Sequence, residues 1–364
     1  MACHTIKLLP FLLVGLFSSC IREVNVPIRN TNSMLVVEGA ITTGSPPYNV
    51  KLTYSGQFSN TLLVPKELYI SDAKVLVLDD MGDSTNCVWT GNGNYQTSDS
   101  GFIGVIGRSY FIKIHLANGK TFISRPEKIL PVPPIDSISV SYDSSYLPGV
   151  RPTQLIISVN TKDPKGMQNF YRWTASTYIP RKSWGNPCVA LPPSPPCVTP
   201  FICKCYALCA QLTFINDINI LSDQFIDGNE ISNRPVFYSP IYWFGRHFTE
   251  VNQFSLTKSA YIFWEQYLAQ TNRTGSILDP LPAALLGNVY NESDRNEIAL
   301  GYFFASDITT KRAIIFPKFV QEYLLEAIAA EFIEMGDCHD TYPNSTPDAT
   351  DPFGWGNVPE IIVE

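Results

Sequence analysis

Cysteines gathered in one stretch of the chain have the clearest potential for chemistry. Nine cysteines occur in the sequence, and thiolates either bind zinc or pair as disulfides. The spacing C-x-C-x3-C from Cys203 to Cys209 lacks a second paired knuckle and a nearby histidine. This disfavours a metal site, and we predict no metal. The disulfide candidates are Cys188, Cys197, Cys203, Cys205, Cys209 and Cys338.

The N-terminus indicates which compartment these thiols meet. Lys7 is the only Lys or Arg in residues 1–19, and the uncharged run Leu8–Phe17 follows it. That run is typical of a signal peptide and is shorter than the roughly 20 residues that cross a bilayer. Two serines before Cys20 resemble the bacterial lipobox, although Phe17 replaces the usual Leu. We predict that Cys20 becomes the lipidated N-terminus. The alternative is an ordinary secretory signal that releases a soluble protein.

Export favours disulfide formation because the destination is oxidising. Seven cysteines follow Cys20, an odd number, so at least one stays unpaired. Cys87 lies alone in the first half of the chain and is interpreted as a buried free thiol. We expect one or more disulfides to stabilise the Cys-rich insertion, with connectivity left open.

Residues for catalysis are few. The histidines beyond the signal are His115, His247 and His339, and the sequence contains no G-x-S-x-G, H-E-x-x-H or phosphate-binding loop. We therefore predict a non-enzymatic protein with no catalytic residues and no cofactor. A surface hydrolase that uses scattered Asp and Glu residues stays open as an alternative. The distance between two such carboxylates in the folded protein cannot be read from a sequence.

Two groups of acidic residues could offer oxygen ligands to calcium. Neither has the alternating D-x-D-x-D-G order of a calcium loop, so we interpret both as polar turns. The groups are Asp79, Asp80 and Asp83, and Asp223, Asp227 and Glu230.

An aromatic stretch, Phe237–Phe248, could contact a partner. Aromatic residues beside an arginine are typical of interface anchors, but filling of a β-rich core explains them more simply and is favoured. The candidates for ligand or partner contact are Tyr242, Trp243 and Phe244.

Composition narrows the class of protein. Charged residues are 16%, hydrophobic residues 45% and the net charge is −7, which excludes a disordered chain and a coiled coil. The sequence has no cluster of Lys and Arg, so we predict no nucleic-acid partner.

The first half reads as antiparallel strands of period two. Ile112 and Ile114 alternate with Lys113 and His115, as a half-buried strand requires. We predict an immunoglobulin-like β-sandwich over residues 34–125, in which Gly107–Tyr110 resembles a tyrosine corner. The clearest strands are 35–42, 49–54, 74–79, 110–116 and 120–124.

The second half is predicted as a separate β-rich domain over residues 135–335. Four prolines at 126–134 exclude continuous regular structure, so we place a linker there, and a tether at 20–33. Hydrophobic periodicity predicts helices at 258–270, with Thr257 as N-cap, and at 318–334. Strands are predicted at 135–142, 154–160, 169–179, 298–305 and 312–316, a hairpin turn at Asp227-Gly228, and a loop-rich tail at 336–364.

Several short sequence segments, or phrases, match a known family in their order and spacing. They are Leu35–Gly39, Asn169–Trp173, Ala260–Trp264, Gly287–Val289 and Gly301–Phe303. Together with the Gly- and Pro-rich stretch after Gln270, they resemble the Bacteroidota lipoprotein family filed as domain of unknown function 4249, over about residues 20–316.

The resemblance implies no catalytic residues. Family members are commonly encoded beside TonB-dependent outer-membrane receptors, which implies an accessory role in nutrient or peptide capture. We therefore expect a lipid-anchored outer-membrane protein, on either face of that membrane, that docks onto such a receptor. The alternative is a structural or adhesive surface protein.

Overall fold

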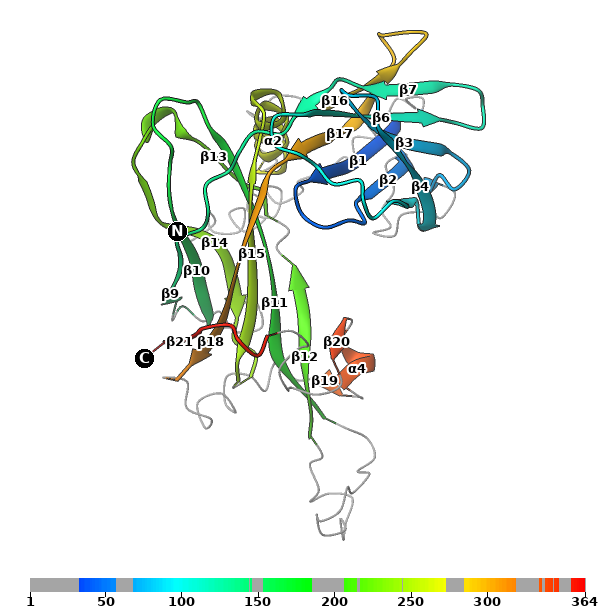
Figure 1. Cartoon of the computed structure of the whole chain (residues 1–364). Coiled ribbons are helices and arrows are strands. Elements are labelled where there is room, and N and C mark those ends of the chain that lie inside the picture. The colour runs from blue at the N-terminus through cyan, green and yellow to red at the C-terminus, as the bar shows by residue number, and fades with distance from the viewer. Residues whose placement is uncertain are drawn as a thin grey trace, which may run out of the picture.

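The structure is mainly β and has two bodies. This computed structural model describes residues 33–56, 68–143, 145, 153–184, 206–214, 217–243, 245–272, 285–318, 334–335, 338–342, 344–346 and 355–363. Figure 1 shows short strands forming a barrel at one end, and longer strands that run away from it. Within these ranges no helix combines the length and the apolar character needed to cross a bilayer.

The barrel is a ten-stranded sheet that closes on itself. Its order is β3-β4-β5-β2-β1-β17-β16-β7-β6-β8, and β3 also pairs with β6. The strands are β1 (Leu35–Thr42), β2 (Asn49–Tyr54), β3 (Lys74–Asp79), β4 (Ser84–Gly91), β5 (Asn94–Thr97), β6 (Ser109–His115), β7 (Thr121–Ser124), β8 (Glu127–Lys128), β16 (Leu286–Asn291) and β17 (Ile298–Ser306).

The predicted strands of the first half are confirmed. In β6, Tyr110, Ile112 and Ile114 are buried in the barrel core while Lys113 and His115 are only half-buried. This is the alternation of a strand with one face inside and one outside.

The predicted immunoglobulin-like sandwich is not confirmed. Among the described residues, the first sheet closes on itself and includes β16 and β17 from the second half of the sequence. Strands β1 and β17 are parallel, with Val37 opposite Gly301. Residues 34–125 therefore do not complete the first body by themselves. Tyr110 does contact the preceding loop, since the Val105 N–H donates to its Oη at 2.9 Å.

The second body consists of two sheets that share one hydrophobic core. A three-stranded sheet has the order β14-β10-β9 and an eight-stranded sheet the order β20-β12-β11-β15-β18-β21, with β13 and β19 also on β11. The strands are β9 (Ser137–Asp143), β10 (Gln154–Lys162), β11 (Phe170–Trp184), β12 (Tyr206–Phe214), β13 (Asn219–Ser222), β14 (Glu230–Pro240), β15 (His247–Ser255), β18 (Ile308–Pro317), β19 (Glu334–Met335), β20 (Ser345–Thr346) and β21 (Glu360–Val363).

Of the two predicted helices, the first is confirmed as α2 (Lys258–Thr271). The Thr257 hydroxyl caps it by accepting the Ala260 N–H at 3.2 Å. For the second, residues 319–333 lie outside the described residues, and Glu334 belongs to β19. The tail is less irregular than predicted, because it contributes the short helix α4 (Cys338–Thr341) and two strands, β20 and β21.

The proline-rich linker is fixed between the two bodies. The Val132 N–H donates to Asp307 Oδ2 at 2.9 Å, and Gln253 Nε2 donates to the Pro133 carbonyl at 2.7 Å. Asp307 also separates β17 in the barrel from β18 in the long sheet, so one nearly continuous stretch of chain crosses the junction. Helix α2 lies at the same junction (Figure 1).

Candidate functional site

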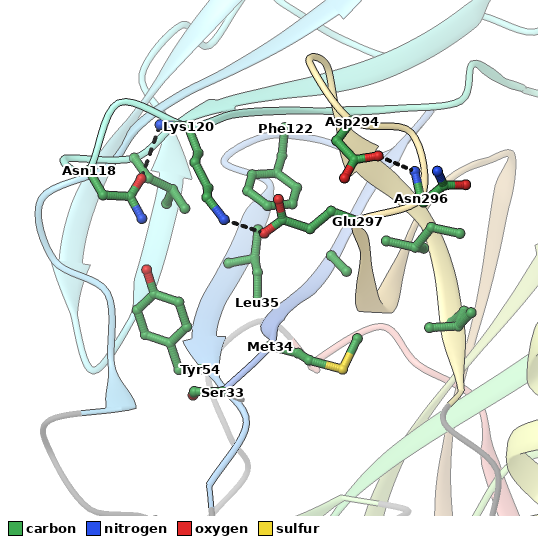
Figure 2. Close-up of a pocket in the computed structure, with 14 residues that line it drawn as sticks. Ser33, Met34, Leu35, Tyr54, Asn118, Lys120, Phe122, Asp294, Asn296 and Glu297 are labelled. Atoms are coloured by element: carbon green, nitrogen blue, oxygen red, sulfur yellow. Dashed lines mark hydrogen bonds and ion pairs between the residues drawn. The ribbon is translucent and has the colours of Figure 1, made fainter. Parts of the chain in front are cut away.

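A pocket of about 480 Å³ opens beside the Lys120 turn of the barrel (Figure 2). Its polar groups pair with one another: Lys120 Nζ donates to Glu297 Oε1 at 2.6 Å and the Asn296 N–H donates to Asp294 Oδ1 at 3.1 Å. The hydrogen bond from Lys120 lowers the pKa of Glu297. The Lys120–Glu297 pair neutralises two of the charges in this lining, and the remaining carboxylate, Asp294, accepts a backbone N–H.

A second pocket, which we call the junction cleft, has a volume of about 410 Å³. It lies between helix α2, the barrel strands β1, β2 and β17, and one side chain of β11. Its volume is within the range of small-molecule sites, which occur preferentially where domains meet. It is lined by Glu38, Gly39, Ala40, Asn49, Lys51, Arg172, Phe263, Trp264, Tyr267, Gly301, Tyr302 and Phe304.

Arg172 is the central charge of the junction cleft. Its guanidinium carbon lies 4.0 Å from the centroid of the Trp264 ring and 5.6 Å from that of Phe304. Burial lowers the pKa of Arg172 to about 10, so the group is still charged at neutral pH. Among the described residues, no hydrogen bond or ion pair involves this guanidinium. Stacking uses its flat face and leaves its N–H edge open.

A second donor beside Arg172 also lacks an acceptor. Trp264 Nε1 is buried and has no hydrogen-bond partner in the described part of the chain. By contrast, Arg234 on β14 donates to Asn219 Oδ1 at 3.0 Å and to the Ile220 carbonyl at 3.2 Å. Because a buried donor is normally paired, the unpaired indole N–H beside the half-buried Arg172 guanidinium indicates a missing acceptor.

The rim of the junction cleft adds one charge of each sign. Glu38 and Lys51 face each other across β1 and β2, and the described residues show no ion pair for either. With Arg172, the lining therefore has a formal net charge of one positive unit.

Glycine shapes the cleft wall where β1, β16 and β17 meet. Gly301 has φ +78°, and a side chain there would place its Cβ 2.2 Å from the Val37 carbonyl oxygen. A Cβ on Gly287 would lie 1.7 Å from the Gly301 oxygen. Only glycine fits such a close backbone approach. The Asn288 side chain bridges this irregularity by bonding both the N–H and the carbonyl of Phe303.

A buried carboxylate holds α2 against the barrel. Glu127 on β8 accepts hydrogen bonds from the hydroxyls of Thr257, Ser259 and Tyr302, the last at 2.5 Å. Thr257 begins α2 and Tyr302 lines the junction cleft. Burial raises the pKa of Glu127 despite these hydrogen bonds, so the folded protein favours the charged form less than the unfolded chain does.

Substituting Glu127 is expected to change the pH dependence of stability. Because the pKa of Glu127 is higher in the folded than in the unfolded protein, its contribution to stability is complete below the unfolded value of 4.5. That contribution is lost as the pH rises through the folded pKa. Glu127→Gln removes this loss, so the urea midpoint of the variant relative to the native chain should increase with pH. Glu265→Gln, on the exposed face of α2, is the control. If the urea midpoints of Glu127→Gln and of the native chain changed with pH in the same way, Glu127 would not be the source of the pH dependence.

Four of the phrases that suggested a family meet around this cleft. They supply Glu38 on β1, Arg172 on β11, Trp264 on α2 and Gly301 on β17. Residues 21–312 match the family described as Domain of unknown function (DUF4249). The chain belongs to this family. No curated protein matches it.

In this DUF4249 member, two of the six disulfide candidates are bonded to each other. Cys209 on β12 is bonded to Cys338 at the start of α4, across 129 residues of sequence. Cys188, Cys197, Cys203 and Cys205 lie outside the described residues. Cys87 is a free thiol, as predicted, but it is half-buried rather than fully buried, and burial raises its pKa to about 12.

The predicted contact aromatics are occupied within the DUF4249 protein itself. Trp243 is buried, with Lys182 Nζ 3.5 Å from its ring centroid. Tyr242 is half-buried, with the Arg181 guanidinium 3.8 Å from its ring centroid. Phe244 lies outside the described residues. Contact of these residues with a partner stays a prediction.

The first acidic group forms a turn, as predicted. Asp79 accepts the N–H groups of Met81 and Asp83 at 3.0 and 2.9 Å, and it pairs with Arg108. The second group differs from the prediction: Asp163 joins Asp223 and Asp227, whereas Glu230 begins strand β14.

Backbone donors explain this second acidic group. Asp163 accepts the Gly228 N–H at 2.9 Å, Asp227 the Gly166 N–H at 2.7 Å and Asp223 the Asn169 N–H at 2.6 Å. Burial, followed by the nearby carboxylates, raises the pKa of Asp223. Hydrogen bonding within the turns therefore accounts for all three carboxylates.

The junction cleft itself was missed by sequence reasoning. The available signal was Arg172, a charged residue inside the otherwise aromatic stretch Phe170–Trp173. It could not be interpreted because its neighbours, Trp264 and Phe304, come from elements far away in the sequence.

Proposed function

We propose that this DUF4249 protein is a non-enzymatic binding module, anchored in the outer membrane through a lipid on Cys20, that serves a TonB-dependent uptake system. The observation that carries the binding role is the junction cleft. A charged guanidinium with an open N–H edge, set among aromatic rings in a cleft of about 410 Å³, is typical of a ligand pocket.

The chemistry of the lining also supports binding. Guanidinium, indole and phenol groups orient a ligand by stacking and hydrogen bonding, and here they are contributed by β11, α2 and β17. Glu127 joins the start of α2 to Tyr302 on β17, and the close approach at Gly301 fixes β17 against β1. A pocket that is formed before the ligand arrives binds with less loss of conformational entropy.

The accessory role rests on family analogy. DUF4249 lipoproteins are commonly encoded beside TonB-dependent receptors, and a binding cleft suits a protein that delivers or retains a nutrient at such a receptor. An interface with the receptor should bury about 1,600 Å² in total.

Affinity purification tests this proposal. A full-length chain with a C-terminal tag is purified from mildly solubilised outer membranes, and its partners are identified by mass spectrometry. We expect a TonB-dependent receptor near one-to-one stoichiometry. Recovery of the chain alone would refute the receptor role and favour the structural or adhesive alternative.

A matched variant tests the anchor. Cys20→Ala removes the thiol that accepts the lipid and leaves residues 21–364 unchanged. We expect this variant to be lost from the outer-membrane fraction, and with it the receptor. Equal membrane recovery of Cys20→Ala and the native chain would refute lipid anchoring at Cys20.

A further inference from the structure

We propose that the junction cleft binds a small organic carboxylate with a planar apolar body. This inference rests on the proposed binding function and names the chemical class of ligand. It is carried by three features of the cleft: the orientation of Arg172, the charge of the lining and the aromatic residues of the walls.

The orientation of Arg172 selects a planar anion. The guanidinium stacks on Trp264 at 4.0 Å from the ring centroid, so its remaining donors lie in the plane of the group. Two parallel N–H groups match the two oxygens of a carboxylate. In the described residues no protein carboxylate takes this position, since Glu38 forms no ion pair with Arg172.

The net charge of the lining favours a single negative charge. Arg172 and Lys51 are cations and Glu38 is an anion, which leaves one positive charge uncompensated. A partly buried charge without a partner is costly, and a monoanion removes that cost. A phosphate dianion would overcompensate the site, whose lining already includes the carboxylate of Glu38.

The walls favour a planar apolar body. Phe263, Trp264 and Tyr267 come from α2, while Tyr302 and Phe304 come from β17. Tyr267 is 43% exposed and so offers its ring to a ligand without rearrangement. Aromatic groups bind by offset or edge-to-face contact with such rings.

Calorimetric titration of the full-length chain in detergent tests the class of ligand. The probes are 2-naphthoate, its neutral analogue 2-naphthamide, and inorganic phosphate. We expect 2-naphthoate to bind at least 10-fold more tightly than either other probe, because only 2-naphthoate combines a carboxylate with a planar body.

Variants of Arg172 test where the carboxylate binds. Arg172→Gln should weaken 2-naphthoate binding about 10- to 100-fold and should leave 2-naphthamide binding nearly unchanged. Arg172→Lys should fall between the two, since it keeps the charge but loses the paired N–H geometry. Arg295→Gln is the control: it removes the same charge from an exposed residue outside the cleft, and it should bind 2-naphthoate like the native chain.

A surface variant keeps the test usable if Arg172 variants do not fold. Tyr267→Ala truncates an exposed residue of α2 and should weaken both naphthyl probes about 3- to 10-fold through lost ring contact.

The possible failures are distinct. Equal affinity for 2-naphthoate and 2-naphthamide would overturn the carboxylate assignment, while the cleft would still be a binding site. Tighter binding of phosphate, or no binding of 2-naphthoate, would also overturn it. The receptor purification is independent of these probes, so its failure would refute the proposed uptake role and not the ligand class.

Discussion

Replacing both Cys209 and Cys338 by alanine is expected to lower the free energy of unfolding by up to about 5 kcal/mol. The disulfide closes a loop of 129 residues, and the chain-entropy cost of closing a loop rises with its length. The bond also fixes α4 against strand β12, where Cys209, Cys338 and Tyr342 form a separate small core. Alanine suits this test because both cysteines are buried, and a serine hydroxyl would need a partner there.

Urea unfolding under non-reducing conditions measures this loss. Cys87→Ala is the matched control, because Cys87 is a free thiol and its removal breaks no cross-link. Mutation is preferable to a reductant, which would act on every disulfide of the chain. An unfolding midpoint of the double variant equal to that of Cys87→Ala would show that the disulfide contributes nothing to the stability of the native fold.

Acidification is expected to destabilise the protein through His247, by about 3 kcal/mol between about pH 7 and about pH 4.5. His247 begins β15 and is 0% exposed. Its Nδ1 lies 2.7 Å from Ser239 Oγ, and Nε2 has no partner among the described residues. Burial lowers the pKa of His247 to about 3.

Proton linkage determines the direction of this pH effect. A folded pKa below the unfolded value of 6.5 means that the unfolded chain binds the proton first. The stabilising contribution is complete above the unfolded value and is lost as the pH falls toward the folded one.

His247→Asn isolates this effect. An asparagine amide can take the place of Nδ1 beside Ser239 and does not titrate, so the variant should lose less stability on acidification than the native chain. His115→Gln is the control, since His115 is a half-buried barrel residue bonded to Thr121. Urea midpoints at several pH values provide the measurement, and identical pH dependence in the native chain and His247→Asn would exclude His247 as the cause.

Local patterns in the sequence determined much of the secondary structure. The alternation in β6 predicted which side chains point into the barrel, and Thr257 predicted the start of α2. Both signals arise between residues a few positions apart, where backbone geometry determines which side chains share a face. Short local segments also predicted the family, and the match of residues 21–312 to that family confirms the prediction.

Only the tertiary structure decided how these elements join. The pairing of β1 with β17 turns an expected sandwich into a barrel, and it connects residues such as Val37 and Gly301 that no sequence period relates. Alternation shows which face of a strand is buried but not which strand lies beside it. The disulfide partner of Cys209, the burial of His247 and the junction cleft likewise depend on which elements pack together, and sequence patterns do not show this.

The cleft illustrates the physical reason. Arg172, Trp264 and Phe304 form a candidate site only when β11, α2 and β17 pack together. Hydrophobic burial, which has no direction and acts over the whole chain, brings these elements into contact. The sequence therefore determined the strands, the helix cap and the family, whereas the fold alone decided where an uncompensated charge meets an aromatic surface.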